Sequence, residues 1–170
     1  MTIQPRAEET RTRILDAAAA GFAERGYDGT SVADICDRAG VSKGAFYHHF
    51  PSKQDLFLEL LERWLDLLED QLDAVRGQEN PVPVQLLAMA DMIRHVFQAA
   101  GDQLPVFIEF WARATHDPVT WQATIAPYHR YQRYFSRMIR VGVAEGTLRP
   151  VDPNTAARVV VSLAVGVVVQ

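Results

Sequence analysis

Apolar residues recur along the chain at the three- and four-residue spacing of amphipathic helices, and residues typical of helix ends bound each run. The first run extends from Ile14 to Phe22 and stops at Gly26. No segment alternates convincingly as a strand, and the Val-rich segment 159–169 would have no other strand to pair with. The pattern therefore predicts an all-α fold.

Two short helices follow the first run. Ser31 and Asp34 form a capping box, in which each side chain satisfies a backbone N–H at a helix start, and this predicts a helix over 32–39. Gly40 suits a tight turn, and Ser42 caps a third helix. The two short helices are thereby held at a fixed angle.

A long fourth helix begins after Pro51, where Ser52 and Asp55 repeat the capping box. Leucines and aromatic residues give it a broad apolar face until Gly77. Four more helices are predicted over 86–97, over 107–114, from 118 to a stop at Gly146, and from 153 through the Val-rich segment. The last two open with an Asp-Pro pair, which is a common helix start.

The composition is that of a globular protein. Hydrophobic residues make up 48% of the 170 residues and charged residues 22%, which argues against wholesale disorder. The N-terminus is polar, and the segment 159–169 is shorter than the ~20 residues of a membrane span. The single cysteine, Cys36, suits a reducing compartment. We therefore expect a cytoplasmic protein without membrane association.

The net charge of −4 is unevenly distributed, with seven basic and seven acidic residues up to Lys53 and the whole excess of acid beyond it. Lys43 and Lys53 are the only lysines, and each directly follows a capping serine, where the helix dipole disfavours a cation. A bound phosphate would reverse that penalty, because the lysine and the helix N-terminus would contact the same anion. The alternative is two exposed lysines tolerated by chance.

The third helix has a polar and an apolar face. At ~100° per residue, the polar arc carries Lys43, Gly44, Tyr47 and His48, and the opposite arc carries Phe46, His49 and Phe50. Gly44 and Ala45 are small enough for the helix to approach base edges in a major groove, and the polar side chains can contact DNA.

The residues from Thr30 to Lys53 closely resemble the helix-turn-helix of the TetR repressor family, and the match extends over about Thr10 to Leu60. The resemblance implies DNA-backbone contacts from Ser31, Tyr47, His48 and Lys53, and base-facing positions at Lys43, Gly44 and Ala45. These seven residues are the predicted DNA-binding site.

The same resemblance implies a domain organisation. We expect a DNA-binding domain over 8–68, with the helix-turn-helix at 31–50, and a helical ligand-binding and dimerisation domain over 69–170. Family members usually continue into a further helix that pairs across the dimer. We therefore expect the second domain to be truncated at its C-terminus or to have an unusual interface, with 159–169 covered by a partner.

Large apolar side chains on the later helices have two interpretations. The general one is a packed core. The one that the resemblance implies is a ligand pocket between helices, lined by Trp64, Met89, Phe97, Phe107, Trp111 and Tyr131. Glu109, Arg113 and His116 are candidate polar anchors in that pocket.

An arginine stripe follows at spacings of three and four, formed by Arg130, Arg133, Arg137 and Arg140. Such a stripe is usually a solvated helix face. An anionic ligand and pairing between protomers are the alternatives.

Together these features predict a sequence-specific transcriptional regulator: a homodimer that represses from a palindromic operator in double-stranded DNA and is released by a small, largely apolar ligand. We expect no enzyme activity, cofactor or metal, because the sequence shows no catalytic or metal-binding motif. One alternative is an adaptor of the same fold that recruits a protein partner and lacks a ligand pocket. The other is a helical small-molecule binder or enzyme that has lost DNA binding.

Overall fold

The computed structural model describes residues 4–101 and 104–168, which form eight helices and no strand. The helices are α1 (Gln4–Gly29), α2 (Val32–Ala39), α3 (Lys43–His49), α4 (Lys53–Arg76), α5 (Val82–Ala100), α6 (Leu104–Ala114), α7 (Pro118–Ala144) and α8 (Pro153–Val168). The predicted all-α fold is confirmed. Among these helices, none has the length and apolar character needed to cross a membrane.

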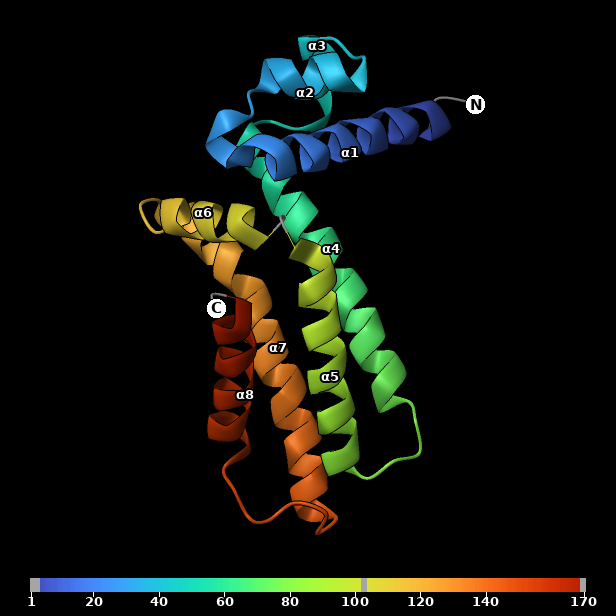
Figure 1. The fold of residues 1–170 in the computed structure, drawn as a ribbon, viewed down its shortest axis with the longest axis vertical. Helices are drawn as coiled ribbons and strands as arrows, with labels where there is room; N and C mark the ends of the chain where they lie inside the picture. Colours follow the sequence, from blue (N-terminus) through green and yellow to red (C-terminus); the bar gives the residue numbers. More distant parts are fainter. Residues whose placement is uncertain (1–3, 102–103, 169–170) are drawn as a thin grey trace.

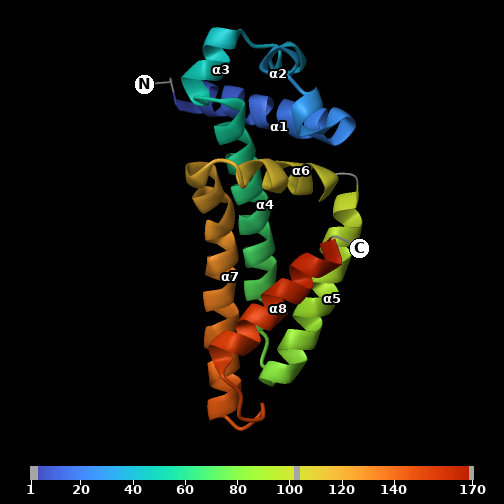
Figure 2. The ribbon, with the colours of Figure 1, turned by 90° about the vertical axis from the view of Figure 1, so that its left-hand side faces the viewer.

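The molecule has a head and a body, joined by α4 (Figure 1). The head consists of α1, α2, α3 and the start of α4. The body consists of the rest of α4 with α5, α7 and α8; α4, α5 and α7 extend along its length, and α8 lies obliquely across it (Figures 1 and 2). Helix α6 lies across the body, between it and α1, and packs against both α1 and α7. This position makes α6 a second connection between the two parts.

Local sequence sets the helix ends in the head. The helical path of α1 breaks at Gly26, whose φ of 73° is in the left-handed region that glycine adopts without strain. Ser31 and Asp34 form the predicted capping box, and α2 occupies 32–39 as expected. Ser42 accepts a hydrogen bond from Ala45 N and starts α3.

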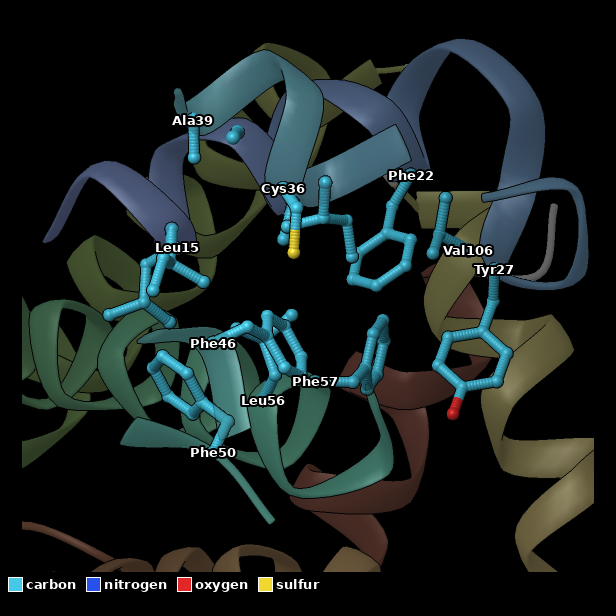
Figure 3. Packing of buried hydrophobic residues seen from close by; sticks show 14 of the residues in the cluster. Leu15, Phe22, Tyr27, Cys36, Ala39, Phe46, Phe50, Leu56, Phe57 and Val106 are labelled. Carbon is cyan, nitrogen blue, oxygen red and sulfur yellow. The ribbon is translucent and has the colours of Figure 1, made fainter. Parts of the chain in front are cut away.

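The head has its own hydrophobic core, in which Phe22, Phe46 and Phe57 are almost completely buried (Figure 3). Ile35 of α2 is buried in the same core. The same cluster includes Val106, Phe110 and Ala114 from α6. Burial of a large apolar side chain contributes about 1.5 to 3 kcal/mol, so these contacts stabilise α6 against the head. The boundary at 68/69 remains a prediction, but the packing assigns α6 to the head core as much as to the body.

A second cluster forms the body core. It contains Leu72 of α4, Met89 of α5, Tyr134 and Ile139 of α7, and Ala157 of α8. Gly142 allows the end of α7 to pack closely, because a Cβ there would lie 2.9 Å from Val82 Cβ and 2.8 Å from a Leu148 methyl carbon. The body is therefore a four-helix assembly in which α7 is central.

Candidate functional site

Helix α3 presents its polar face to solvent and buries its apolar face. Phe46 is completely buried and Phe50 nearly so, whereas Tyr47 is 54% exposed. Lys43, Gly44 and His48 are exposed on the same outward face as Tyr47. The predicted division of the helix is therefore present in the fold.

The turn between α2 and α3 is fixed by main-chain and side-chain hydrogen bonds. Val41 N donates to Cys36 O at 3.0 Å, and Gly40 takes a left-handed φ of 63°. The guanidinium of Arg13 on α1 donates to the carbonyls of Ala39 and Gly40. Because the carbonyls at the end of α2 have these partners, the angle between α2 and α3 is held from the side of α1.

The seven predicted DNA-binding residues divide into three groups. Lys43, Gly44, Tyr47 and His48 lie together on the exposed face of α3, and Ala45 beside them is half-buried. Ser31 is exposed, but its hydroxyl is engaged with Asp34 in the capping box. The third group is Lys53 alone.

Lys53 points inward, unlike Lys43. Its ammonium donates to Tyr27 O at 2.8 Å and to Thr30 O at 3.0 Å, and it lies 4.2 Å from the centre of the Tyr27 ring. Burial of the ammonium lowers the pKa of Lys53. The expected pair of equivalent lysines is thus absent in this conformation, and a phosphate contact by Lys53 would have to use its remaining N–H or follow a change of rotamer.

Tyr27 is the residue on which the head and α6 converge. Its ring packs against Phe22 and Phe57, with centroid separations of 5.4 and 5.3 Å (Figure 3). The ring of Phe110 on α6 lies at 5.2 Å. Burial raises the pKa of its hydroxyl. Sequence reasoning did not single out Tyr27; the signal that could have found it is an aromatic residue directly after a helix-ending glycine.

The carboxylate of Glu109 on α6 accepts hydrogen bonds from two head amides, Tyr27 N at 2.9 Å and Asp28 N at 3.0 Å. A Cβ at Gly26 would lie 2.9 Å from Glu109 Oε2, so the absence of a side chain there permits the approach. Arg113, one turn further along α6, pairs with the carboxylate of Asp28. We call Glu109 and Arg113, with their contacts at Tyr27 and Asp28, the α6 latch.

An apolar cavity of about 210 Å³ lies among α4, α5, α6, α7 and α8. Its lining is almost entirely apolar, and its few polar groups include the hydroxyls of Thr124, Tyr128 and Tyr131. Tyr131 donates to Leu65 O at 2.7 Å, and burial raises its pKa. The Tyr128 hydroxyl is hydrogen-bonded to Ser162 at 2.8 Å. The cavity therefore offers apolar contact with little free hydrogen-bonding capacity.

The fold brings five of the six predicted ligand-binding residues together around this cavity: Trp64, Phe97, Phe107, Trp111 and Tyr131. Met89 is in the body core and does not line it. The three candidate anchors are also elsewhere. Glu109 and Arg113 form the latch, and His116 borders a separate groove near the start of α7. None of the three lines the apolar cavity, because α6 directs Glu109 and Arg113 toward the head and His116 follows the end of α6.

Comparisons with known proteins match both parts of the chain. Residues 14–60 match the family described as bacterial regulatory proteins, tetR family. Residues 85–170 match the family described as BetI-type transcriptional repressor, C-terminal.

Individual proteins are similar over most of the chain. The HTH-type transcriptional repressor KstR2 of Mycobacterium tuberculosis is 47% identical over 143 residues, covering 82% of this chain and 70% of KstR2. A transcriptional regulator from Saccharomonospora viridis, solved in complex with choline, is 27% identical with a TM-score of 0.78, covering 96% of this chain and 85% of that one. AibR, solved with isovaleryl coenzyme A and operator DNA, is 26% identical with a TM-score of 0.71, and the match covers 95% of this chain and 86% of AibR.

Proposed function

This chain belongs to the TetR family of bacterial regulatory proteins, and on that premise we propose that it is a transcriptional repressor released from its operator by a small, largely apolar ligand. It binds a palindromic operator as a homodimer. Helix α3 enters the major groove, where Lys43, Gly44 and Ala45 face the bases. Ser31, Tyr47, His48 and Lys53 contact the DNA backbone. The exposed polar face of α3, set on a rigid head core, supports this assignment.

The ligand binds in the apolar cavity. A cavity of about 210 Å³ is larger than the 150 Å³ cavity that holds benzene in an engineered protein, but smaller than typical sites for drug-sized ligands. It therefore suits a short branched chain or a single ring. Solved relatives differ in what they hold, since one contains choline and AibR contains isovaleryl coenzyme A. The apolar lining of the cavity favours an acyl group, such as the isovaleryl group, over a cation such as choline.

The observation that carries the proposal is the double role of α6. Phe107, Phe110 and Trp111 on this helix line the cavity, while Glu109 and Arg113 hold the head through the latch. A ligand that displaces the aromatic residues would move the latch with them, because all five side chains belong to one helix of three turns. The position of the head relative to the body would then change, and with it the separation of the two heads of a dimer.

The adaptor alternative has less support. An adaptor needs no ligand pocket, so a body without an internal cavity would favour the adaptor. The cavity between α4 and α8 favours the ligand-controlled repressor instead.

The experiment begins by selecting an operator from random DNA duplexes with the purified protein. Operator affinity is then measured by fluorescence anisotropy with and without short-chain acyl coenzyme A thioesters, beginning with isovaleryl coenzyme A. A responsive repressor should lose affinity by about 5- to 150-fold, the usual range of coupling between two sites. Leu61→Trp should fill the cavity and abolish the response while operator affinity stays unchanged.

Leu67→Trp is the matched control, because Leu67 lies on the same helix as Leu61 but is 63% exposed and does not line the cavity. It should respond as the wild type does. Failure to select any duplex would refute the repressor assignment. A response that persists in Leu61→Trp would refute the cavity as the ligand site.

A further inference from the structure

A second recess, an open groove of about 600 Å³, lies between α7 and α8 and is chemically unlike the apolar cavity. Four arginines line it: Arg133, Arg137 and Arg140 from α7, and Arg158 from α8. No carboxylate is among its lining residues in the described part of the chain. We call it the arginine groove.

These four arginines differ from the arginines on α4, α5 and α6 in having no carboxylate partner in an ion pair among the described residues. Every arginine on α4, α5 and α6 has one, namely Arg63, Arg76, Arg94 and Arg113. On α7, Arg130 lies within 2.8 to 3.3 Å of three carboxylates on α4. Within the described ranges, Arg133, Arg137 and Arg140 have no ion pair, and Arg158 reaches only Thr155 Oγ1 at 3.4 Å.

The predicted arginine stripe is thus divided by the fold. Arg130 turns toward α4 and is neutralised there, so it behaves as a structural ion pair. The other three line the arginine groove together with Arg158. Placing four cations along one groove is unfavourable unless solvent or an anion screens them.

The polar residues between the arginines also offer donors. Ser136 is buried and donates to Asn154 Oδ1 at 2.6 Å. This bond leaves the amide nitrogen of Asn154 without a partner among the described residues, with its two N–H groups available. The groove therefore combines positive charge with a hydrogen-bond donor and no acidic competitor.

We propose that the arginine groove is a second ligand site, which binds a small molecule carrying at least two phosphoryl groups. The guanidinium is planar and presents paired N–H donors that match phosphate oxygens, so Arg–phosphate contacts are both strong and geometrically specific. Each phosphomonoester carries about −1.5 to −2 at neutral pH, so two phosphoryl groups balance most of the four positive charges.

A second copy of the chain is a poorer occupant. In a twofold contact whose axis passes through the groove, arginines of one protomer would face arginines of the other. Asp152 caps the start of α8 by accepting from Thr155 N at 2.7 Å, and the hydrogen bonds from Thr155 together with the nearby charge of Arg158 lower its pKa. Its carboxylate is already engaged, so it is not free to pair across such an interface.

The test is titration calorimetry of the whole chain with inorganic pyrophosphate, and with orthophosphate for comparison. Pyrophosphate should bind once per chain and more tightly than orthophosphate. The double variant Arg133→Gln, Arg137→Gln should weaken pyrophosphate binding about tenfold or more. Each substitution removes a hydrogen bond between a guanidinium and a phosphate oxygen, and such charged hydrogen bonds contribute more to affinity than neutral ones. Arg94→Gln is the control and should leave the affinity within about twofold, because Arg94 is on α5 outside the groove.

Three results would overturn the proposal. One is the absence of pyrophosphate binding. Another is binding that the double variant leaves unchanged. The third is a change in oligomeric state of the double variant in analytical ultracentrifugation, which would make the groove an interface between protein chains. Thermal unfolding of the double variant, which should match the wild type within about 2 °C for exposed side chains, confirms that it is folded.

Discussion

Lys43 and Lys53 occupy equivalent positions in the sequence, each directly after a capping serine, but their ammonium groups have different surroundings. Lys43 is exposed at the start of α3, and Lys53 is bonded to two carbonyls of the head. The difference follows from the position of Tyr27 and Thr30, which lie beside the start of α4 and not beside that of α3. The two residues should therefore respond differently to substitution.

Replacing Lys43 by alanine should weaken operator binding without destabilising the head. A base-facing lysine contributes about 1 to 3 kcal/mol to specific binding, and an exposed side chain contributes little to folding. Anisotropy titration measures the affinity, and thermal unfolding measures the stability. An unchanged affinity for the selected operator would contradict the predicted base-facing role of Lys43.

Replacing Lys53 by methionine should destabilise the protein. The change removes two charged hydrogen bonds and leaves the carbonyls of Tyr27 and Thr30 with poorer partners, at a cost of about 1 to 3 kcal/mol. Urea unfolding measures this loss. The predicted phosphate contact is tested separately, because losing one contact lowers the slope of log affinity against log salt by about 1. An unchanged slope would show that Lys53 is a residue of the head core alone.

At the scale of the element, the start of α2 links helix capping to pH. Asp34 accepts from the backbone N–H and hydroxyl of Ser31, and these bonds, with Arg25 nearby, lower its pKa from 3.8 to about 2. Because the folded state holds the proton less tightly, the unfolded state binds more protons between these values. The contribution of Asp34 is therefore complete above 3.8 and disappears as the pH falls to about 2.

Asp34→Asn should consequently be less stable than the wild type near neutral pH, and the gap between their melting temperatures should narrow as the solution is acidified through that window. Circular dichroism melts at several pH values measure the gap. Asp16→Asn, at an exposed position of α1, is the matched control for the loss of a surface carboxylate. A gap of constant size would mean that the capping box does not depend on the charge of Asp34.

Helix α6 shows how an element of three turns can serve two parts of the molecule. Its apolar residues divide between the head core and the cavity, and its two charged residues form the latch. No residue of α6 needs to contact both DNA and ligand for the two sites to be coupled. In the proposed mechanism α6 moves as a rigid unit, so a shift at the cavity reaches the latch directly.

At the scale of the whole molecule, one chain offers one head, and a single helix-turn-helix contacts too few base pairs for high specificity. Our proposed homodimer places two heads on the same face of DNA, with half-sites about 34 Å apart or at a multiple of that distance. Inserting five base pairs between the half-sites of the selected operator rotates one of them by about half a turn.

Affinity for the extended operator should then fall by about 100-fold or more, because only one head can bind specifically. Gel-shift titration measures the change, and an operator with an altered spacer of unchanged length is the control. Equal binding to both duplexes would indicate that the heads bind independently, which would exclude a dimer of fixed geometry.

The family and the helix boundaries of the head were accessible from the sequence. The capping residues and glycines place the ends of α2 and α3, and the phenylalanines of α3 show which face is buried. Five of the six residues proposed for the cavity also line it. Periodicity identified them as inward-facing, but it did not distinguish a cavity wall from a filled core, so Met89 was included although it lies in the core.

What the sequence determined by itself depends on residues within about four positions of each other, because helix periodicity and capping act over one turn. The direction of Lys53, the latch made by Glu109 and the division of the arginine stripe depend on partners 26, 82 and 61 to 68 positions away in the chain. Long charged side chains have many rotamers of similar energy, and the partner that packing brings within reach selects among them. Only the tertiary structure could therefore decide which cations of this protein are neutralised internally and which remain available to an anion.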